Sequence, residues 1–389
     1  MKRLAVTAGR VMTPDRVILD GVVLVEGSRI LEVGSRAAVR FSGDEFEVMN
    51  HPRQLLAPGF IDVHIHGALG RDVMEGTGEA LEVISGFLAA HGTTSFLATT
   101  MTASPIATLR AVEALGRQVN QPLPGARMLG LHLEGPFINP EKRGAHPAEH
   151  IRRPSALIFE QLLARSGRQV KLMTLAPEVE GSLELIEFAR SRGVVVSLGH
   201  SNATLEETLA AIDLGAANAT HLFNAMRSFS HRDPGILGAV LTAPQVWAEL
   251  IADGVHVSPT AVELCLQCKG AGKILLISDA VSPTGMPEGQ YRLADGEITL
   301  SDGVCRTPDG TLAGSILTQD QALRNLVRWS RLPVQTVLGM LTRNPAQSLG
   351  IADSKGSLAA GKDADMVLLD ESLGVHTTIV QGEVSHTVG

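Results

Sequence analysis

The sequence has little cysteine, no long apolar run and no excess of basic residues. Three cysteines in 389 residues are too few for a disulfide framework, which favours a reducing compartment. No run approaches the roughly 18 apolar residues that a membrane span needs, and residues 1–13 lack the apolar stretch of a signal peptide. The net charge of −8 argues against nucleic acid or an anionic membrane as the main partner. We therefore expect a soluble, cytoplasmic protein with no nucleic-acid and no membrane partner.

Apolar runs alternate with amphipathic stretches through the middle of the chain, starting at residue 57. Eight apolar runs are expected to be strands: 59–67, 93–99, 127–133, 171–176, 194–200, 219–223, 249–252 and 274–279. Helices are expected between most of them, at 79–90, 105–119, 156–165, 183–192 and 205–214. This βαβα order indicates a parallel sheet, and eight alternations favour a closed (β/α)₈ TIM barrel over an open doubly wound sheet.

The two ends of the chain have a different pattern. Residues 1–56 and 356–389 carry short alternating segments broken by Gly and Asp, which we expect to pair as one small β-sandwich domain. Residues 57–355 are then expected to form the barrel domain. A Gly- and Asp-rich β insertion is expected at about 288–314, followed by helices at 318–330 and 334–349.

His64 and His66 are the first residues along the chain whose spacing is compatible with a metal site. They lie two apart in an expected strand, so both imidazoles project from the same face, as two ligands of one divalent metal ion would. By itself such a pair is equally compatible with a polar pair in the core or on the surface.

Other residues of metal-ligand type recur at the carboxyl ends of later strands. They are Glu134, His200, His221 and Asp279. Each alone could be a hydrogen-bonded loop residue, but the carboxyl ends of barrel strands meet at one mouth, where active sites of this fold lie. Burial of an unpaired His or carboxylate is costly. Six such residues at one mouth favour a metal site over independent structural roles.

These segments resemble the amidohydrolase superfamily, and within it the N-acetylglucosamine-6-phosphate deacetylases. The segments that carry the resemblance are 57–67, His132-Leu-Glu-Gly-Pro-Phe137, Lys142-Arg-Gly-Ala-His146, 199–201, Thr220-His-Leu-Phe-Asn-Ala-Met226, 252–256, 278–280 and the tail 356–365. The tail and the His-x-His pair are typical of the superfamily. The Glu-Gly-Pro and His-Leu-Phe-Asn-Ala-Met segments are typical of the deacetylases.

The resemblance implies one or two divalent metal ions. Glu134, His200 and His221 would hold the principal ion, with Asp279 beside it. His64 and His66, which some family members lack, would hold a second ion bridged through Glu134. Lys171 lies at the wrong end of its strand to bridge two ions as a carbamylated lysine. Zinc suits these ligands best, with iron, cobalt or manganese as alternatives.

The implied reaction is hydrolysis of N-acetylglucosamine 6-phosphate to glucosamine 6-phosphate and acetate, in amino-sugar catabolism or recycling. A metal-activated water would attack the acetamide, with Asp279 as general base and then general acid. The preference among related N-acyl amino-sugar phosphates stays open. By resemblance, Arg232 and His256 would bind the phosphate.

The same resemblance places further residues around the sugar and its acetyl group. These are Ala145, His146, Asn224, Ala225, Leu312, Ala313, Gly314 and Ser315. Without the resemblance, Arg232 would be read as a solvated surface charge. Because one phosphate contact in this family can come from a neighbouring subunit, a homodimer is expected.

Two alternatives remain. Another amidohydrolase, such as a cyclic amidase of the dihydroorotase kind or a purine deaminase, would share the barrel, the His-x-His pair and the tail, but would not need Arg232 and His256. A non-catalytic barrel that binds or assembles is the second alternative, since a fold does not guarantee activity. Such a protein would be expected to lose ligand-type residues, whereas all six are of coordinating type here.

Overall fold

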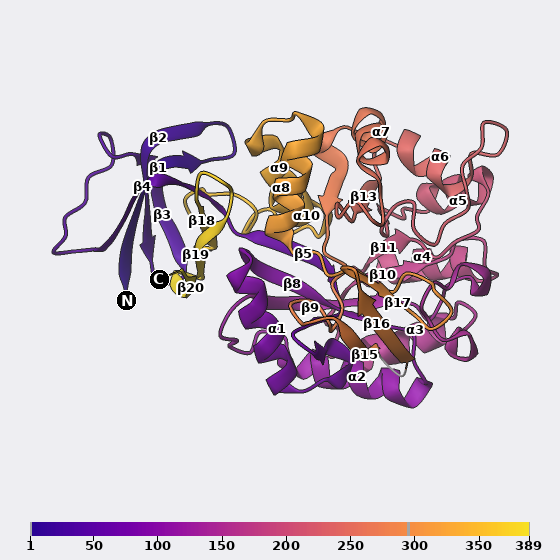
Figure 1. Ribbon diagram of the computed structural model, residues 1–389. Coiled ribbons are helices and arrows are strands. Elements are labelled where there is room, and N and C mark those ends of the chain that lie inside the picture. The colour runs from indigo at the N-terminus through magenta and orange to yellow at the C-terminus, as the bar shows by residue number, and fades with distance from the viewer. Residues whose placement is uncertain (1, 294–295, 389) are drawn as a thin grey trace.

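The barrel sheet is the centre of the computed structural model, which describes residues 2–293 and 296–388 (Figure 1). Residues 1, 294–295 and 389, which belong to the expected terminal domain and insertion, lie outside the described residues. Eight parallel strands follow one another in chain order around the sheet. They are β5 (Phe60–Ile65), β8 (Thr93–Thr100), β9 (Arg127–Glu134), β10 (Val170–Leu175), β11 (Val195–Leu198), β12 (Asn218–Ala219), β13 (Trp247–Leu250) and β14 (Ile274–Leu276).

The sheet closes between its first strand and the segment that follows β14. Ile65 pairs in parallel with Ala280, and the Asp279 N–H donates to the His64 carbonyl oxygen at 2.9 Å. Closure confirms the expected (β/α)₈ barrel. All eight expected strands are present, although several of them, such as β12, are shorter than the apolar runs that predicted them.

Helices follow most of the barrel strands and cover the outside of the barrel (Figure 1). They are α1 (Gly78–Ala90), α2 (Pro105–Gln118), α3 (Ala156–Arg165), α4 (Ser182–Ser191), α5 (Leu205–Asp213), α6 (Gly235–Thr242), α7 (Pro259–Lys269), α8 (Gln319–Ser330), α9 (Val334–Leu341) and α10 (Arg343–Ser348). Local chemistry sets their starts: Ser104 caps α2 and Ser258 caps α7, each directly before a proline at the first helical position.

Two helical regions differ from the expectation. Helix α6 was not predicted, because nearly all of its residues are buried and apolar, and a helix that is apolar all round has no 3.6-residue pattern. The single helix expected at 334–349 is two helices, α9 and α10. They are separated at Thr342, whose backbone (φ −129°, ψ −80°) lies outside the helical region.

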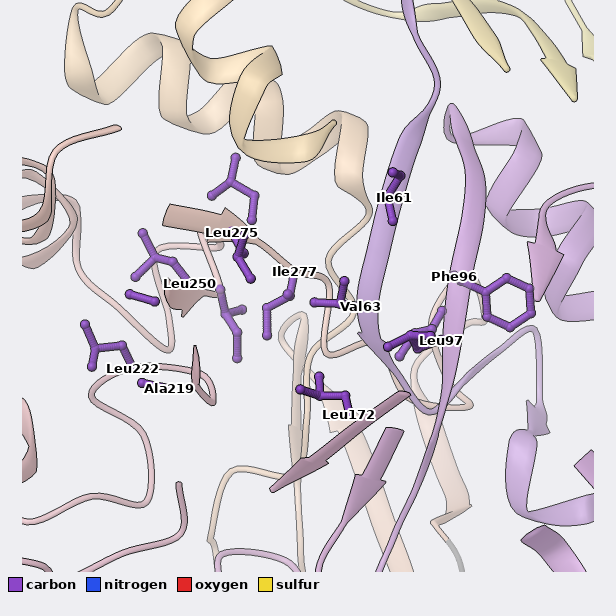
Figure 2. Packing of buried hydrophobic residues seen from close by; sticks show 14 of the residues in the cluster. Ile61, Val63, Phe96, Leu97, Leu172, Ala219, Leu222, Leu250, Leu275 and Ile277 are labelled. Atoms are coloured by element: carbon purple, nitrogen blue, oxygen red, sulfur yellow. The ribbon is translucent and has the colours of Figure 1, made fainter. Parts of the chain in front are cut away.

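Apolar side chains from β5 to β14 and the surrounding helices form one continuous core. Ile61, Val63, Leu172, Leu250 and Leu275 all belong to it (Figure 2), and all are at most 1% exposed. This packing fixes the strands rigidly, and the loops at their carboxyl ends are held by the same core.

A seven-stranded sheet unites the two ends of the chain, which lie together on one side of the barrel (Figure 1). Its order is β20-β19-β18-β4-β1-β2-β3, and β18 from the C-terminal segment pairs antiparallel with β4. The strands are β1 (Arg3–Met12), β2 (Val17–Glu26), β3 (Arg29–Ser35), β4 (Glu47–Pro58), β18 (Met366–Leu369), β19 (Val375–Val380) and β20 (Glu383–Thr387). The expected β structure built from both termini is therefore present, as one seven-stranded sheet.

A small antiparallel sheet lies beside the barrel mouth, where the sequence predicted an insertion. It is formed by β15 (Gly289–Leu293), β16 (Gly296–Ser301) and β17 (Val304–Arg306). Its apolar face packs on Met101 and Val281, which come from loops at the mouth. Within the described part of the chain, no helix is long and apolar enough to cross a membrane.

Candidate metal centre and substrate cavity

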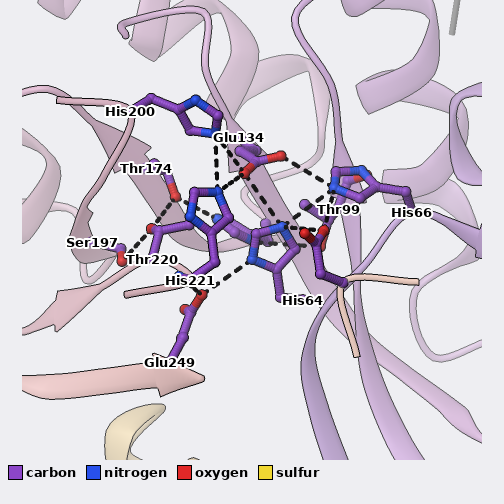
Figure 3. Close-up of polar contacts among 12 residues, drawn as sticks. His64, His66, Thr99, Glu134, Thr174, Ser197, His200, Thr220, His221 and Glu249 are labelled. Atoms are coloured by element: carbon purple, nitrogen blue, oxygen red, sulfur yellow. Dashed lines mark hydrogen bonds and ion pairs between the residues drawn. The ribbon is translucent and has the colours of Figure 1, made fainter. Parts of the chain in front are cut away.

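The six ligand-type side chains predicted from the sequence lie together at the barrel mouth. Figure 3 labels all of them except Asp279. His64 is on β5 and Glu134 is the last residue of β9. His66, His200, His221 and Asp279 lie in the segments just after β5, β11, β12 and β14. All six are at most 7% exposed. Strands far apart in the sequence thus bring them to one point, as closure of a parallel barrel requires.

Three of the six residues have left-handed backbone: His200 (φ 49°), His221 (φ 31°) and Asp279 (φ 49°). A residue other than glycine in this region costs about 1–3 kcal/mol, and such strain is concentrated at functional sites. Neighbouring hydrogen bonds hold the conformation; for example, the Asn139 N–H donates to the His200 carbonyl oxygen at 3.0 Å. The turns point the three side chains back into the barrel mouth.

Glu134, His200 and His221 form the first group. Glu134 Oε1 lies 3.1 Å from His200 Nε2 and 3.0 Å from His221 Nε2. The two imidazole Nε2 atoms are 3.0 Å apart. One carboxylate oxygen and two imidazole nitrogens therefore face one another at a single point.

His64, His66 and Asp279 form the second group. Asp279 Oδ1 lies 3.3 Å from the Nε2 atom of each histidine, and these two Nε2 atoms are themselves 3.3 Å apart. Glu134 joins the two groups: its Oε1 is 3.4 Å from His64 Nε2, and its Oε2 is 3.1 Å from His66 Nε2. A single carboxylate therefore lies between two sets of donors.

The hydrogen bonds made by the Nδ1 atoms of two histidines show that their Nε2 atoms suit a cation. His66 Nδ1 is 3.0 Å from the Thr99 carbonyl oxygen, and His200 Nδ1 is 2.8 Å from the Lys142 carbonyl oxygen. A carbonyl oxygen only accepts, so each neutral ring carries its proton on Nδ1 and directs the Nε2 lone pair into the centre. Lone pairs that face one another at close range repel unless a positive ion lies among them. The residues therefore fit a divalent metal ion.

The carboxylates of Glu134 and Asp279 favour a positive charge among the six side chains. Burial by itself lowers the pKa of His64 and of His66, but the carboxylates of Glu134 and Asp279 outweigh it, raising the pKa of His64 well above its ordinary value and that of His66 to about 9. Burial would raise the pKa of Asp279, yet His64 and His66 bring it down to about 2. Asp279 is therefore a carboxylate at neutral pH.

A cavity of about 480 Å³ opens onto the centre. Of the residues predicted to surround a substrate, seven line it: Ala145, His146, Asn224, Ala225, His256, Leu312 and Gly314. Ala313 and Ser315 are buried behind this wall, where Ser315 Oγ donates to the Ser278 carbonyl oxygen at 2.6 Å. Arg232 is exposed in the loop before α6 and is not among the lining residues.

Comparison with known proteins decides the family. The amidohydrolase family profile matches residues 55–385. The chain belongs to the amidohydrolase family.

Relatives that are about 40% identical include deacetylases of amino-sugar phosphates. An N-acetylglucosamine-6-phosphate deacetylase of Lysinibacillus sphaericus is 41% identical over 85% of each chain. An N-acetylgalactosamine-6-phosphate deacetylase of Escherichia coli O157:H7 is 40% identical over 87% of this chain and 89% of its own. A solved N-acetyl-D-glucosamine-6-phosphate deacetylase mutant of Mycobacterium smegmatis, in complex with N-acetyl-D-glucosamine-6-phosphate, covers all of both chains at 34% identity with a TM-score of 0.93.

His146 has its tautomer fixed in this amidohydrolase. The Thr102 N–H donates to His146 Nδ1 at 3.2 Å, so the proton of the neutral ring is on Nε2, which lies 3.4 Å from Glu134 Oε2. Burial, partly opposed by the hydrogen bond to Glu134, lowers the pKa of His146 to about 4. The ring therefore presents a neutral N–H donor beside the centre rather than a lone pair.

Several residues at the centre were not singled out from the sequence. Glu249 on β13 contacts His64, and the ring of His132 on β9 packs nearly perpendicular to the His64 ring. Burial and the neighbouring His64 lower the pKa of His132 well below its ordinary value. The signal available for Glu249 was an acidic residue inside an otherwise apolar strand. Lys142 and Arg143 also line the cavity.

Proposed function

We propose that this amidohydrolase hydrolyses N-acetylglucosamine 6-phosphate to glucosamine 6-phosphate and acetate. The observation that carries the proposal is the convergence of six buried ligand-type side chains on one cavity, in a chain similar over most of its length to deacetylases of such substrates. We place catalysis in residues 57–355, with segments 1–56 and 356–389 as a supporting domain.

We propose that Glu134, His200 and His221 hold one divalent ion, and that His64, His66 and Asp279 hold a second. The two groups of donors, which share Glu134 between them, support this division. Zinc suits a mixed set of imidazoles and carboxylates best, and iron, cobalt or manganese could occupy the same donors.

The proposed chemistry follows from the charge states of the side chains. A divalent ion, when bound, polarises the acetyl carbonyl group and makes water acidic enough to ionise near neutral pH. Asp279, ionised at neutral pH, accepts the proton of the attacking water and then passes it to the leaving nitrogen as the C–N bond breaks. His146 offers its Nε2–H to the acetyl oxygen.

We propose that His256 and Arg232 bind the substrate phosphate, with Arg232 acting in the cavity of a second copy. His256 lines the cavity, whereas Arg232 lies outside the wall of its own cavity in an exposed loop. Phe229 in the same loop is 58% exposed and would be covered if this loop lay against a second copy. A homodimer would complete each site.

The deciding experiment is acetate release from N-acetylglucosamine 6-phosphate, with and without a chelator. We expect release that the chelator abolishes and added zinc restores. N-Acetylgalactosamine 6-phosphate is the necessary second substrate, because a relative named for that activity is 40% identical, against 41% for one named for the glucosamine compound. Release of ammonia instead of acetate would favour a deaminase, and no stoichiometric metal would favour a non-catalytic barrel.

A further inference from the structure

Glu249 is a buried carboxylate to which the proposed chemistry gives no role. It lies on β13 with an exposed fraction of 0%, and its Oε2 is 3.1 Å from His64 Nδ1 (Figure 3). Its other oxygen, Oε1, has no hydrogen-bond partner in the described part of the chain. A half-satisfied carboxylate in an apolar barrel is costly, so its presence needs a physical reason.

The contact with Glu249 determines which nitrogen of His64 carries the proton. A carboxylate only accepts hydrogen bonds, so a neutral His64 must keep its proton on Nδ1. The Nε2 lone pair then faces Glu134 and Asp279, at 3.4 and 3.3 Å. The opposite tautomer would set a lone pair against Glu249 and turn an N–H toward the place where an ion would bind.

His64 differs from the other three histidines proposed as metal ligands in how it is held. His66 and His200 are oriented by backbone carbonyl oxygens, and His221 Nδ1 has no partner among the residues described. Of these four ligand histidines, only His64 is oriented by a side chain of the described residues. The same oxygen of Glu249 also accepts the His221 backbone N–H at 3.4 Å, which ties His64 to the other group of donors.

We propose that Glu249 is a positioning residue that gives the group of His64, His66 and Asp279 its affinity for a metal ion. The inference rests on the metal centre proposed above. Partners that hydrogen-bond to the ligands of a metal typically change its affinity by about 10- to 100-fold. Loss of Glu249 should therefore weaken metal binding at this group by that factor, while the ion held by Glu134, His200 and His221 should stay tightly bound.

The test counts ions rather than turnover. The full-length protein is depleted of metal with a chelator and titrated with Zn²⁺ against a chromophoric competitor, and with Co²⁺ followed by its visible spectrum. The wild type should take up two ions per chain. Glu249→Leu has a side chain of similar size but no hydrogen-bond acceptor. This variant should keep one tightly bound ion and bind the second about 10- to 100-fold more weakly. Glu249→Gln, which retains an acceptor, should fall between the two.

A carboxylate–histidine pair away from the centre provides the control. Asp320 on α8 is 6% exposed and lies 3.0 Å from His91 Nδ1, so Asp320→Asn disturbs a contact of the same kind without touching the metal residues. It should lower thermal stability and leave both ions in place. Should Glu249→Leu fail to fold, Glu249→Gln compared with Asp320→Asn carries the test.

Three outcomes would overturn the proposal: Glu249 variants that bind both ions as the wild type does, variants that lose both ions equally, or a wild type that binds a single ion and is unaffected by the substitutions. None of these outcomes depends on the substrate. Acetate release by the wild type tests the proposed function separately, so the failure of one can be told from the failure of the other.

Discussion

Two groups of buried charges in this protein are balanced in different ways. Where the terminal sheet meets the barrel, Lys355 lies 2.9 Å from Asp363 and also hydrogen-bonds to Asp365, and all three side chains are at most 9% exposed. Burial alone would lower the pKa of Lys355, but the two aspartates raise it, so this group carries a fixed cation at neutral pH.

At the barrel mouth, the acids face imidazoles instead. Glu134 and Asp279 are surrounded by histidines, whose positive charge depends on protonation. A fixed lysine fills its place permanently, whereas imidazoles can give up their protons and offer lone pairs to an exchangeable ion. The comparison suggests that the buried acids matched by Lys355 stabilise the fold, while the acids surrounded by several histidines at the barrel mouth form a site. Substitutions around Lys355 should therefore lower stability and leave activity unchanged. Substitutions at the barrel mouth should lower activity and leave the protein folded.

The largest expected effect is on turnover, from Asp279→Asn. Loss of a general base and acid typically costs about 10²–10⁴-fold in rate, so acetate release should fall by that factor. The protein should stay folded, because the neighbouring histidines can lose their protons when an acid is neutralised. Metal content is measured alongside. Turnover within a few-fold of the wild type, at unchanged metal content, would contradict the assignment.

Lys355→Met should instead lower the stability of the fold and leave turnover unchanged. Removal of one partner from a buried ion pair leaves an uncompensated charge and costs about 3–5 kcal/mol in the free energy of unfolding, measured by urea denaturation. Acetate release per folded molecule should not change. Arg29→Ala is the matched control, because Arg29 contacts the same Asp363 at 2.6 Å from a side chain that is 55% exposed, and exposed pairs contribute about 0–1 kcal/mol. Equal losses for the two variants would show that burial is not the cause.

The sequence predicted the barrel and the residues on its regular strands well, and the loops beyond them less well. His64 and Glu134 lie on β5 and β9, where strand geometry determines the direction of each side chain. His200, His221 and Asp279 were expected at or within strands but lie beyond the ends of β11, β12 and β14. Their left-handed backbone is held by contacts between distant segments, which no local pattern encodes.

Residues that act through other residues were the hardest to predict. Glu249 is one acidic residue in an apolar strand, and only barrel closure places it against His64, which precedes it by 185 positions. Helix α6 was missed for a related reason: it is buried on all sides, so its position depends on tertiary packing. The loop before α6 carries Arg232, which does not line the cavity of its own chain. The role of Arg232 as a phosphate contact stays a prediction.

Arg232→Ala tests a charge outside both buried groups. A hydrogen bond to a charged group contributes about 1.5–3 kcal/mol, so KM for N-acetylglucosamine 6-phosphate should rise roughly 10- to 100-fold with little change in stability. The unphosphorylated sugar should show no comparable change. Mixing Arg232→Ala with a catalytically dead Asp279→Asn chain would sharpen the test, because mixed dimers should regain low KM only if the arginine acts across subunits.

The smallest expected effect concerns His256, an imidazole matched by a single acid. Burial lowers its pKa, but the hydrogen bond from Nδ1 to Asp253 at 2.6 Å outweighs burial and leaves the pKa above 6.5. A raised pKa means that the stability from this pair is fully present below about pH 6.5 and is lost as pH rises through the raised value.

The same protonation should control phosphate binding. As pH rises through the raised pKa of His256, KM for the phosphorylated sugar should increase by about tenfold. The proton left on the neutral ring stays on Nδ1 against Asp253, so Nε2 can no longer donate to the phosphate, and a charge-assisted hydrogen bond of about 1.5 kcal/mol is lost. Measured above about pH 7, this rise cannot come from the substrate, since a phosphate ester with a second pKa of about 6 is already a dianion. Asp253→Asn should move the rise to lower pH, because it removes the main cause of the raised pKa. An unchanged profile in that variant would show that His256 does not bind the phosphate as a cation, and would leave Asp253 with a purely structural role like that of Asp363.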